Sequence, residues 1–321
     1  MTKLESIEIK NIRPLTDVKI SFAAYDMVEK KDEHIGMAAF EKKDTIFITS
    51  INDYMCNSAV ECIIQSMALF CRPYGKMQPN WFDDRVSEES YIRLVFDVEN
   101  DMISYCNNQV KRITVEYKWT EESVAKGCID DDIVYFDDML IDNWNDDERY
   151  IFHKVRWFII DKVVESADRC MEVMGGLPGN ILTAFDINGF DEITANTGRL
   201  IPWMSVLGSN AKGHLFLGKR MFEGLHPLLM NHFIDVMLNM HEHDRDGDDG
   251  RQVIFSCIQT YFMKEVDAHS HRCRVYIIDT DGTSRMYYKK YYKDSEYRDS
   301  ETQLIDMIEN NEFGKEKEMI R

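Results

Sequence analysis

The most constraining feature of the sequence is the stretch from Thr45 to Leu69. An apolar run, Thr45–Thr49, is followed by a short polar segment and then, over residues 60–68, by apolar side chains at helical spacing. Asn57 or Ser58 is expected to cap the helix that carries these side chains. A strand that leads through a polar loop into an amphipathic helix predicts an α/β unit.

The same order of strand, polar loop and helix is the one in which nucleotide-binding proteins present a phosphate loop. Such a loop needs glycines for close backbone approach, a lysine for the terminal phosphates, and Ser or Thr for magnesium. Between Ser50 and Ser58 there is no glycine and no lysine, and only Asn52 and the pair Asn57-Ser58 suggest the motif. Two interpretations stay open: a phosphate loop that has lost its chemistry, or an ordinary strand-to-helix turn.

Other segments of the chain also predict strands and helices. Residues 4–10 and 17–22 alternate polar and apolar side chains, which predicts an edge hairpin turning at Arg13-Pro14. The runs between Tyr91 and Trp119 predict an antiparallel meander that forms a sheet of its own. Further strands are expected at 36–40, 214–217, 252–256 and 274–279, and helices at 150–174, 227–240, 261–266 and 301–311.

Composition limits the classes of function. A chain of 321 residues with 44% hydrophobic and 30% charged residues is typical of globular proteins, as one large domain or two modest ones. The net charge of −19 argues against unaided binding to nucleic acid or an anionic membrane, because phosphate binding needs a positive surface. Nucleic acid is therefore expected only indirectly, through a partner. The acid-rich residues 130–148 predict either a solvated face or a docking surface for a basic partner.

The cysteines and the first residues of the chain indicate the cellular compartment of the protein. Eight cysteines are scattered along the chain without a C-x-x-C pair, and many lie in apolar runs. This usage favours buried thiols in a reduced cytoplasm over disulfides or zinc sites. The opening residues lack the basic and apolar regions of a signal peptide, and no apolar run approaches the length of a membrane span. We expect a cytoplasmic protein without membrane association.

Two runs in the last third of the chain are more specific: LFLGKRMFEGLHP, Leu215–Pro227, and QVIFSCIQTYFM, Gln252–Met263. They are similar to the Walker B and switch segments of ABC-type ATPases of the SMC/RecF/OLD branch. The opening LESIEIKNIRPLTDVKISF resembles the first hairpin of that family. The run VYIIDTDGTSRMYY resembles the end of compact prokaryotic members found among defence ATPases. The resemblance spans both ends of the chain, while residues 75–200 match only in general character.

The resemblance implies an α/β fold of the ABC/SMC-like P-loop NTPase type, with a mixed central sheet, an antiparallel β subdomain and a helical insert. It implies a single discontinuous domain in which residues 1–74 and 175–321 form the nucleotide-binding-like core and residues 75–174 form the insert. Members of this family work as head-to-head dimers. A homodimer, or a heteromer with an intact ATPase or effector subunit, is therefore implied.

The departures from the family pattern are equally specific. If Ser50–Asn57 is aligned with the phosphate loop, Met55 and Cys56 replace its last glycine and its lysine. A neutral thiol cannot replace an ammonium that pairs with phosphate, and one lost charged hydrogen bond costs on the order of 1.5–3 kcal/mol. Lys219 and Arg220 stand where the family has Asp-Glu, and two cations can neither organise magnesium nor activate water.

In the switch segment Ile258 replaces the histidine. The degenerate nucleotide-site positions are therefore Ser50, Asn52, Met55, Cys56, Asn57, Ser58, Lys219, Arg220 and Ile258.

These departures lead to a first hypothesis of a catalytically inactive pseudo-ATPase that needs neither ATP nor magnesium. It would act as a regulatory or scaffolding subunit through dimerisation or partner binding, in a prokaryotic defence or DNA-associated complex. Lys219 and Arg220 are then expected to pair with acidic residues, since unpaired buried charges are costly.

Two alternatives stay open. The chain could be the ATP-binding or ATP-hydrolysing subunit of a composite site, with ATP and magnesium, in a DNA-repair or antiviral ATPase complex. It could also be an unrelated α/β protein. In that case a central mixed sheet with the amino-terminal hairpin packed beside it would be missing.

Overall fold

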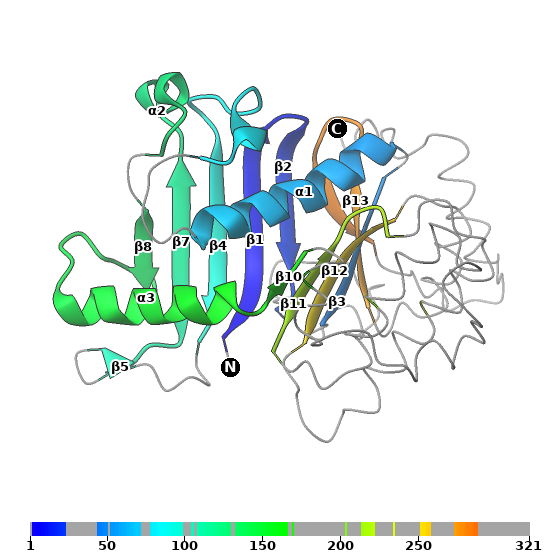
Figure 1. The fold of residues 1–321 in the computed structure, drawn as a ribbon. Coiled ribbons are helices and arrows are strands. Elements are labelled where there is room, and N and C mark those ends of the chain that lie inside the picture. Colours follow the sequence, from blue (N-terminus) through cyan, green and yellow to red (C-terminus); the bar gives the residue numbers. More distant parts are fainter. Residues whose placement is uncertain are drawn as a thin grey trace, which may run out of the picture.

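The fold consists of two sheets that lie side by side, with a long helix crossing from one to the other (Figure 1). In this computed structural model the described residues are 2–23, 44–50, 52–71, 78–98, 104–105, 108–129, 132–165, 213–221, 251–257 and 273–287, with the single positions 169, 203 and 234. Everything said below of contacts, or of their absence, concerns these residues.

The first sheet is antiparallel, with six strands in the order β2-β1-β4-β7-β8-β9. Its strands are β1 (Lys3–Ile12), β2 (Leu15–Ser21), β4 (Tyr91–Asp97), β7 (Arg112–Lys118), β8 (Ile133–Phe136) and β9 (Met139–Leu140). The predicted edge hairpin is confirmed, because β1 and β2 pair across the Arg13-Pro14 turn and β2 ends the sheet. The prediction of a separate sheet for the meander is wrong, because β4 pairs with β1 from Lys3 opposite Asp97 to Lys10 opposite Tyr91.

The amino-terminal hairpin and the meander form one sheet because they share an apolar face. Ile7, Leu94 and Val115 lie on adjacent strands and are buried in one core, so the hairpin and the meander complete a single surface. The middle run of the predicted meander does not join this sheet. There β5 (Ser104–Tyr105) pairs with β6 (Asn108–Gln109), while β4 and β7 pair directly with each other.

The second sheet is mixed and has six strands in the order β10-β11-β12-β3-β13-β14. Its strands are β10 (Val163–Val164), β11 (Leu215–Gly218), β12 (Gln252–Cys257), β3 (Thr45–Thr49), β13 (Arg274–Ile278) and β14 (Ser284–Tyr287). All neighbours are parallel except β13 and β14. Every residue of the four strands β3, β11, β12 and β13 is buried, as expected for parallel strands. The expected mixed central sheet is confirmed.

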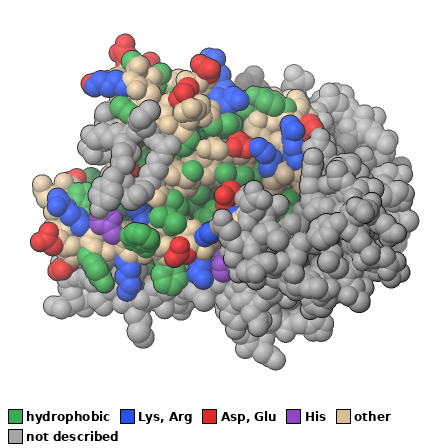
Figure 2. Space-filling model, viewed as in Figure 1, with side chains coloured by type: hydrophobic (Ala, Val, Ile, Leu, Met, Phe, Trp, Pro, Cys, Tyr) green, Lys and Arg blue, Asp and Glu red, His purple; other side chains and the backbone are tan. Residues whose placement is uncertain are grey.

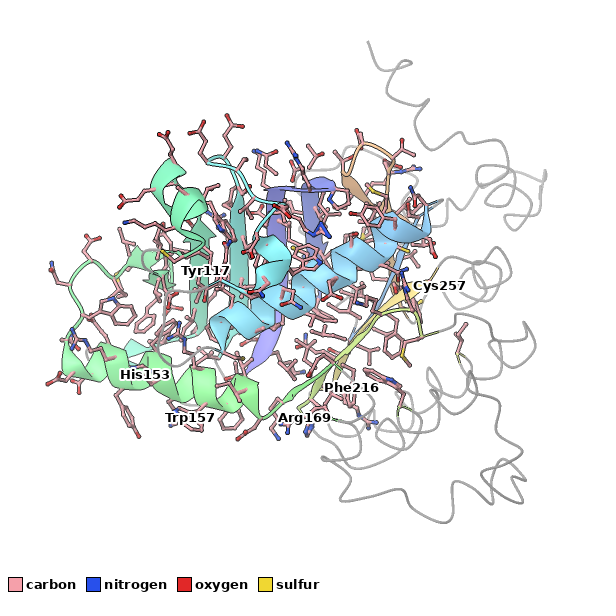
Figure 3. The ribbon with its side chains drawn as sticks, turned by 45° about the horizontal axis from the view of Figure 1, so that its top comes forward. Tyr117, His153, Trp157, Arg169, Phe216 and Cys257 are labelled. Carbon is pink, nitrogen blue, oxygen red and sulfur yellow. The ribbon has the colours of Figure 1, made fainter. Side chains whose placement is uncertain are left out.

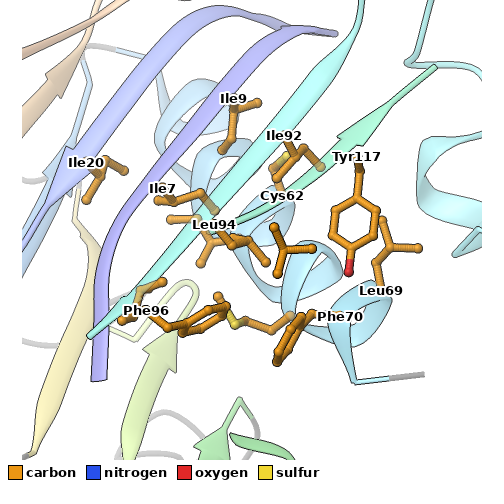
Figure 4. Packing of buried hydrophobic residues seen from close by; sticks show 14 of the residues in the cluster. Ile7, Ile9, Ile20, Cys62, Leu69, Phe70, Ile92, Leu94, Phe96 and Tyr117 are labelled. Atoms are coloured by element: carbon orange, nitrogen blue, oxygen red, sulfur yellow. The ribbon is translucent and has the colours of Figure 1, made fainter. Parts of the chain in front are cut away.

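The helix after β3 begins earlier than the sequence predicts. Helix α1 spans Asp53–Phe70, and its cap is Asn52, whose side chain accepts a hydrogen bond of 2.9 Å from the Tyr54 N–H. The prediction that Asn57 or Ser58 caps the helix is wrong, because Asn52 satisfies the first free N–H one turn upstream. One face of α1 packs on the antiparallel sheet, where the rings of Phe70 and Phe96 lie 4.8 Å apart (Figure 4).

The helix predicted at residues 150–174 also has other bounds in the structure. Helix α3 spans Asp146–Ile160 and starts at a capping box, in which Asn145 and Glu148 exchange side-chain-to-backbone hydrogen bonds. The helix stops before Val163–Val164, because these residues form β10 and pair with β11. The short helices α2 (Glu121–Lys126) and η3 (Asn80–Phe82) lie in the connections.

Several predicted elements lie outside the described residues. These are the strand at 36–40 and the helices at 261–266 and 301–311, while the helix at 227–240 is represented by Ile234 alone. The domain boundaries after residues 74 and 174 stay a prediction. Among the helices of the described part, none is long and apolar enough to cross a membrane.

Side-chain hydrogen bonds tie the two sheets together. The side-chain amide of Gln252, at the start of β12, bonds both backbone groups of Leu4. The Leu4 N–H donates to Gln252 Oε1 at 2.8 Å, and Gln252 Nε2 donates to the Leu4 carbonyl at 2.6 Å. These bonds form at a register shift between Leu4 and Ser6, where β1 departs from regular pairing. The Gln252 side chain thus makes the two hydrogen bonds with Leu4 that the backbone of a neighbouring strand would make.

The edge strand β2 makes a second set of links. Tyr276 on β13 accepts a hydrogen bond of 3.0 Å from the Ser21 N–H, and Arg274 Nη1 donates to the Ala23 carbonyl at 2.9 Å. The Lys19 N–H donates to Ser284 Oγ on β14 at 2.7 Å. The amino-terminal hairpin therefore packs beside the mixed sheet, which contradicts the interpretation as an unrelated α/β protein.

We predict that Gln252→Ala lowers the free energy of unfolding by about 2–4 kcal/mol, because it leaves a buried N–H and a buried carbonyl of Leu4 unpaired. Denaturant unfolding measures the change. The matched control is Gln65→Ala on α1, a partly exposed glutamine that bonds only another side chain in the described structure and should cost less than about 1 kcal/mol. Equal effects of the two substitutions would contradict this account of the junction.

Candidate functional site

The candidate site lies where the carboxyl ends of β3, β11 and β12 meet at one edge of the mixed sheet. In open α/β sheets this edge is where ligands bind. Helix α1 begins at the same edge, and Figure 3 shows Cys257, the last residue of β12, close to the start of the helix. The fold therefore places the phosphate-loop candidate beside Lys219 and Arg220, which follow β11 directly.

The connection between β3 and α1 is short. Only residues 50–52 separate the strand from the helix. Ser50 Oγ donates to the Ile278 carbonyl at 2.7 Å and accepts from the Asn52 N–H at 3.2 Å, while Asn52 caps the helix. Both side chains thus bond protein backbone. The other predicted loop positions lie in the first two turns of α1, and they are Met55, Cys56, Asn57 and Ser58.

The start of α1 carries a negative charge. Asp53 is exposed in the first turn, where a carboxylate interacts favourably with the helix dipole. An anionic ligand at this end would face the same N–H groups and the same dipole. The Asp53 carboxylate therefore opposes the binding of a phosphate here.

Cys56 points into the protein core. The side chain is fully buried in the cluster that includes Met55, and the Cys56 Sγ donates to the Asp53 carbonyl at 3.4 Å. Burial, with a smaller contribution from the Asp53 charge, raises the pKa of the Cys56 thiol to about 12. A neutral thiol therefore occupies the position that the family resemblance assigns to the phosphate-binding lysine.

Asn57, Ser256 and Arg220 form a hydrogen-bonded chain across the site. The Arg220 N–H donates to Ser256 Oγ at 3.0 Å, and the Ser256 hydroxyl donates to Asn57 Oδ1 at 2.7 Å. Ser256 and Asn57 are both buried. This chain links the segment after β11 through β12 to α1.

The backbone around Arg220 is tightly constrained. Arg220 has a φ of 55°, in the left-handed region that is uncommon for residues other than glycine. Two residues earlier, a Cβ added to Gly218 would lie 2.3 Å from Phe255 Cδ1. The strand end therefore packs closely against β12, and the Ser256 hydroxyl holds the turn that follows it.

Lys219 forms an ion pair with Glu61, one turn after Asn57 on α1. The second oxygen of the Glu61 carboxylate accepts a hydrogen bond of 2.8 Å from Gln65 Nε2. Both Glu61 oxygens are thus used. The expected ion pair is confirmed for Lys219, the residue that the family resemblance aligns with a metal-organising acid.

One polar atom of the site has no protein partner. The Asn57 Nδ2 group is buried and makes no hydrogen bond to the described residues. Buried donors are nearly always satisfied by protein, water or a ligand. Among the described groups of the site, this amide therefore has the capacity to donate one more hydrogen bond.

Sequence reasoning missed Ser256 and Glu61, which pair with predicted residues, and Gln65, which bonds Glu61. A signal existed for two of them, because Glu61 and Gln65 lie four and eight residues after Asn57 and share its helix face. Ile258 lies outside the described residues. Within the described ranges no group of three or more His, Cys, Asp or Glu side chains is placed to hold a metal ion.

We predict that Ser256→Ala lowers the free energy of unfolding by about 1–3 kcal/mol, because Asn57 Oδ1 and the Arg220 N–H both lose their partner. Chemical denaturation gives the value. Ser66→Ala is the matched control. The buried Ser66 hydroxyl donates to the Cys62 carbonyl within the same helix, and losing this hydrogen bond should cost about 1 kcal/mol or less. A neutral Ser256→Ala variant would show that the chain of bonds does not hold the site.

No protein-family model matches the sequence, and no curated protein matches it. Among solved structures, the fold is similar to the Smc head domain of Pyrococcus furiosus with an extended coiled coil, bound to the C-terminal domain of ScpA. The TM-score is 0.51 at 7% identity, over 97% of this chain and 100% of that chain.

Two further structures match with lower scores. One is cbiO1 from Clostridium perfringens, part of the ABC transporter complex cbiONQ, with a TM-score of 0.37 at 10% identity over 98% of this chain and all of that chain. The other is the recombination mediator RecF, with a TM-score of 0.25 at 12% identity over 74% of this chain and 51% of that chain. The mixed central sheet, the antiparallel sheet and the likeness to the Smc head together show an ABC/SMC-like P-loop ATPase fold.

Proposed function

We propose that the chain is a catalytically inactive ABC-type pseudo-ATPase that works by binding other subunits. The observation that carries the proposal is that groups at three of the expected nucleotide-site positions bond to neighbouring residues of the protein. Lys219 pairs with Glu61, and Ser256 joins Asn57 to the Arg220 backbone. Protein contacts take the place that phosphate and magnesium contacts hold in an active site.

The charges of the site support the same proposal. Magnesium prefers carboxylate oxygens and water, whereas the strand end after β11 carries Lys219 and Arg220. Phosphate needs cations and free N–H groups, whereas the start of α1 carries Asp53, and Cys56 is a buried neutral thiol. In a magnesium–ATP complex, the magnesium would meet the cations Lys219 and Arg220, and the phosphates would meet the carboxylate of Asp53. The residues present therefore do not fit this complex.

A subunit without catalysis acts through its surfaces. The Smc head domain that resembles this chain was solved bound to the C-terminal domain of another protein, ScpA. For this chain we propose a regulatory or scaffolding role as a homodimer, or as a heteromer with an intact ATPase or effector subunit. We further propose that it acts in a cytoplasmic prokaryotic defence or DNA-associated complex, a proposal that the sequence resemblance to compact defence ATPases supports.

Calorimetric titration with ATP and magnesium tests the proposal. We predict no binding heat up to about 1 mM ATP, the upper end of ordinary enzyme–substrate constants. A cooperative thermal unfolding transition of the same sample shows that the protein is folded. Micromolar binding that is lost when Asn57 is replaced by Leu would contradict the proposal.

A second candidate function is favoured by one observation, the unpaired Asn57 Nδ2 group. A buried donor beside a helix start is suited to a phosphate oxygen, so the chain could bind ATP as half of a composite site in a repair or antiviral complex. That function requires ATP turnover after mixing with an intact ATPase partner, and loss of turnover when Lys219 or Arg220 is replaced.

A further inference from the structure

Exposed apolar side chains are concentrated in one stretch of the chain. Among the described residues, six large hydrophobic side chains are exposed, and five of them lie between positions 139 and 158. These five are Met139 and Leu140 on β9 and Tyr150, Trp157 and Phe158 on α3. Such a concentration on a folded chain marks an interaction surface more often than chance.

Helix α3 presents two distinct faces. The inner face packs into the core through Phe152, whose ring lies 6.0 Å from the ring of Phe70. The outer face carries Tyr150, Lys154 and Trp157 at a spacing that puts them in one row, and Tyr150 and Trp157 are 69% and 64% exposed. The inner face anchors the helix, and Tyr150 and Trp157 are not part of the core cluster.

The exposed charges in the same stretch of the chain are mainly negative. Between positions 137 and 161 six exposed residues are acidic and two are basic. The acids are Asp137, Asp138, Asp142, Asp146, Asp147 and Asp161, and the bases are Arg149 and Lys154. Figure 2 shows acidic side chains at the end of α3 where the helix begins, next to hydrophobic ones. We call β9, the following loop and the outer face of α3 the α3 surface.

From this combination we infer that the α3 surface docks a basic amphipathic protein segment, whose apolar side chains cover Tyr150 and Trp157 while Lys or Arg side chains face the acids. Tyrosine and tryptophan supply large contact areas and are enriched among the residues that dominate binding. The surrounding carboxylates select a cationic partner and speed its association. An amphipathic helix laid on an apolar strip is a common form of such recognition.

Charge also argues against other occupants. A second copy of this chain carries the same net charge of −19 and the same acids, so two α3 surfaces would repel each other. Nucleic acid and anionic membranes are repelled for the same reason. The inference rests on the proposed function only in taking the chain to act by binding a partner, and it does not require an inactive nucleotide site.

The test uses the full-length protein and a fluorescein-labelled peptide of leucine and lysine in the i, i+3, i+4 helical pattern. Fluorescence anisotropy gives the dissociation constant. We predict measurable binding that weakens at least about tenfold in Tyr150→Ser/Trp157→Ser and in Asp146→Asn/Asp147→Asn, and that weakens with salt. The same peptide with glutamate in place of lysine should not bind.

Two matched variants separate this surface from general attraction to an acidic protein. Tyr54→Ser removes the one exposed large hydrophobic residue described elsewhere, and Glu88→Gln/Glu89→Gln removes two exposed acids elsewhere. Both should change the dissociation constant by less than about twofold. Equal weakening in these controls, or unchanged binding in Tyr150→Ser/Trp157→Ser, would overturn the inference.

Self-association is decided in the same samples. Sedimentation should give the same oligomeric state for the wild type and Tyr150→Ser/Trp157→Ser. A wild-type dimer that becomes monomeric in this variant would overturn the inference in favour of a contact between two copies. Calorimetry with ATP is independent of these measurements, so failure here and failure of the proposed function are distinguishable.

Discussion

Two sheets are joined in this protein by side chains that take the place of a neighbouring strand, and the rest of the structure depends on that junction. Gln252 bonds both backbone groups of Leu4, and Tyr276 and Arg274 bond the end of the β2 edge. Helix α1 then packs on both sheets at once, because its core cluster contains residues of β1 and β4 as well as of β3 and β12. The helix therefore lies against both sheets at the place where they are joined.

That placement brings the start of α1 to the ends of β11 and β12, where it can bond with them. Asn57 reaches Ser256, and Glu61 reaches Lys219 from the next turn of the helix. The family resemblance assigns the positions of Asn57 and Lys219 to phosphate and magnesium contacts. In this structure both side chains bond to other residues of the protein, which stabilises the arrangement of α1 against β11 and β12.

Much of this could be predicted from the sequence, and the failures have physical causes. The strands β3, β11, β12 and β13 are short and largely apolar runs, so the sequence identifies them as buried strands, and the resemblance to ABC-type ATPases implied that they belong to a mixed central sheet. The start of α1 was misplaced because a cap one turn earlier, Asn52, satisfies the same N–H groups. The end of α3 was misplaced because pairing of β10 with β11 overrides helical spacing. The pairing partners of Lys219 and Asn57 depend on contacts between distant segments, which local patterns do not contain.

Hydrogen exchange at the start of α1 tests the central claim most directly, because it reports both binding and its location. The amides of residues 53–58 would be compared with and without ATP and magnesium, with the amides of α3 as an internal reference. The account predicts unchanged exchange at both helices, since Lys219, Ser256 and Asn57 Oδ1 already have protein partners. Protection confined to residues 53–58 would contradict it and would show that the fold still binds nucleotide.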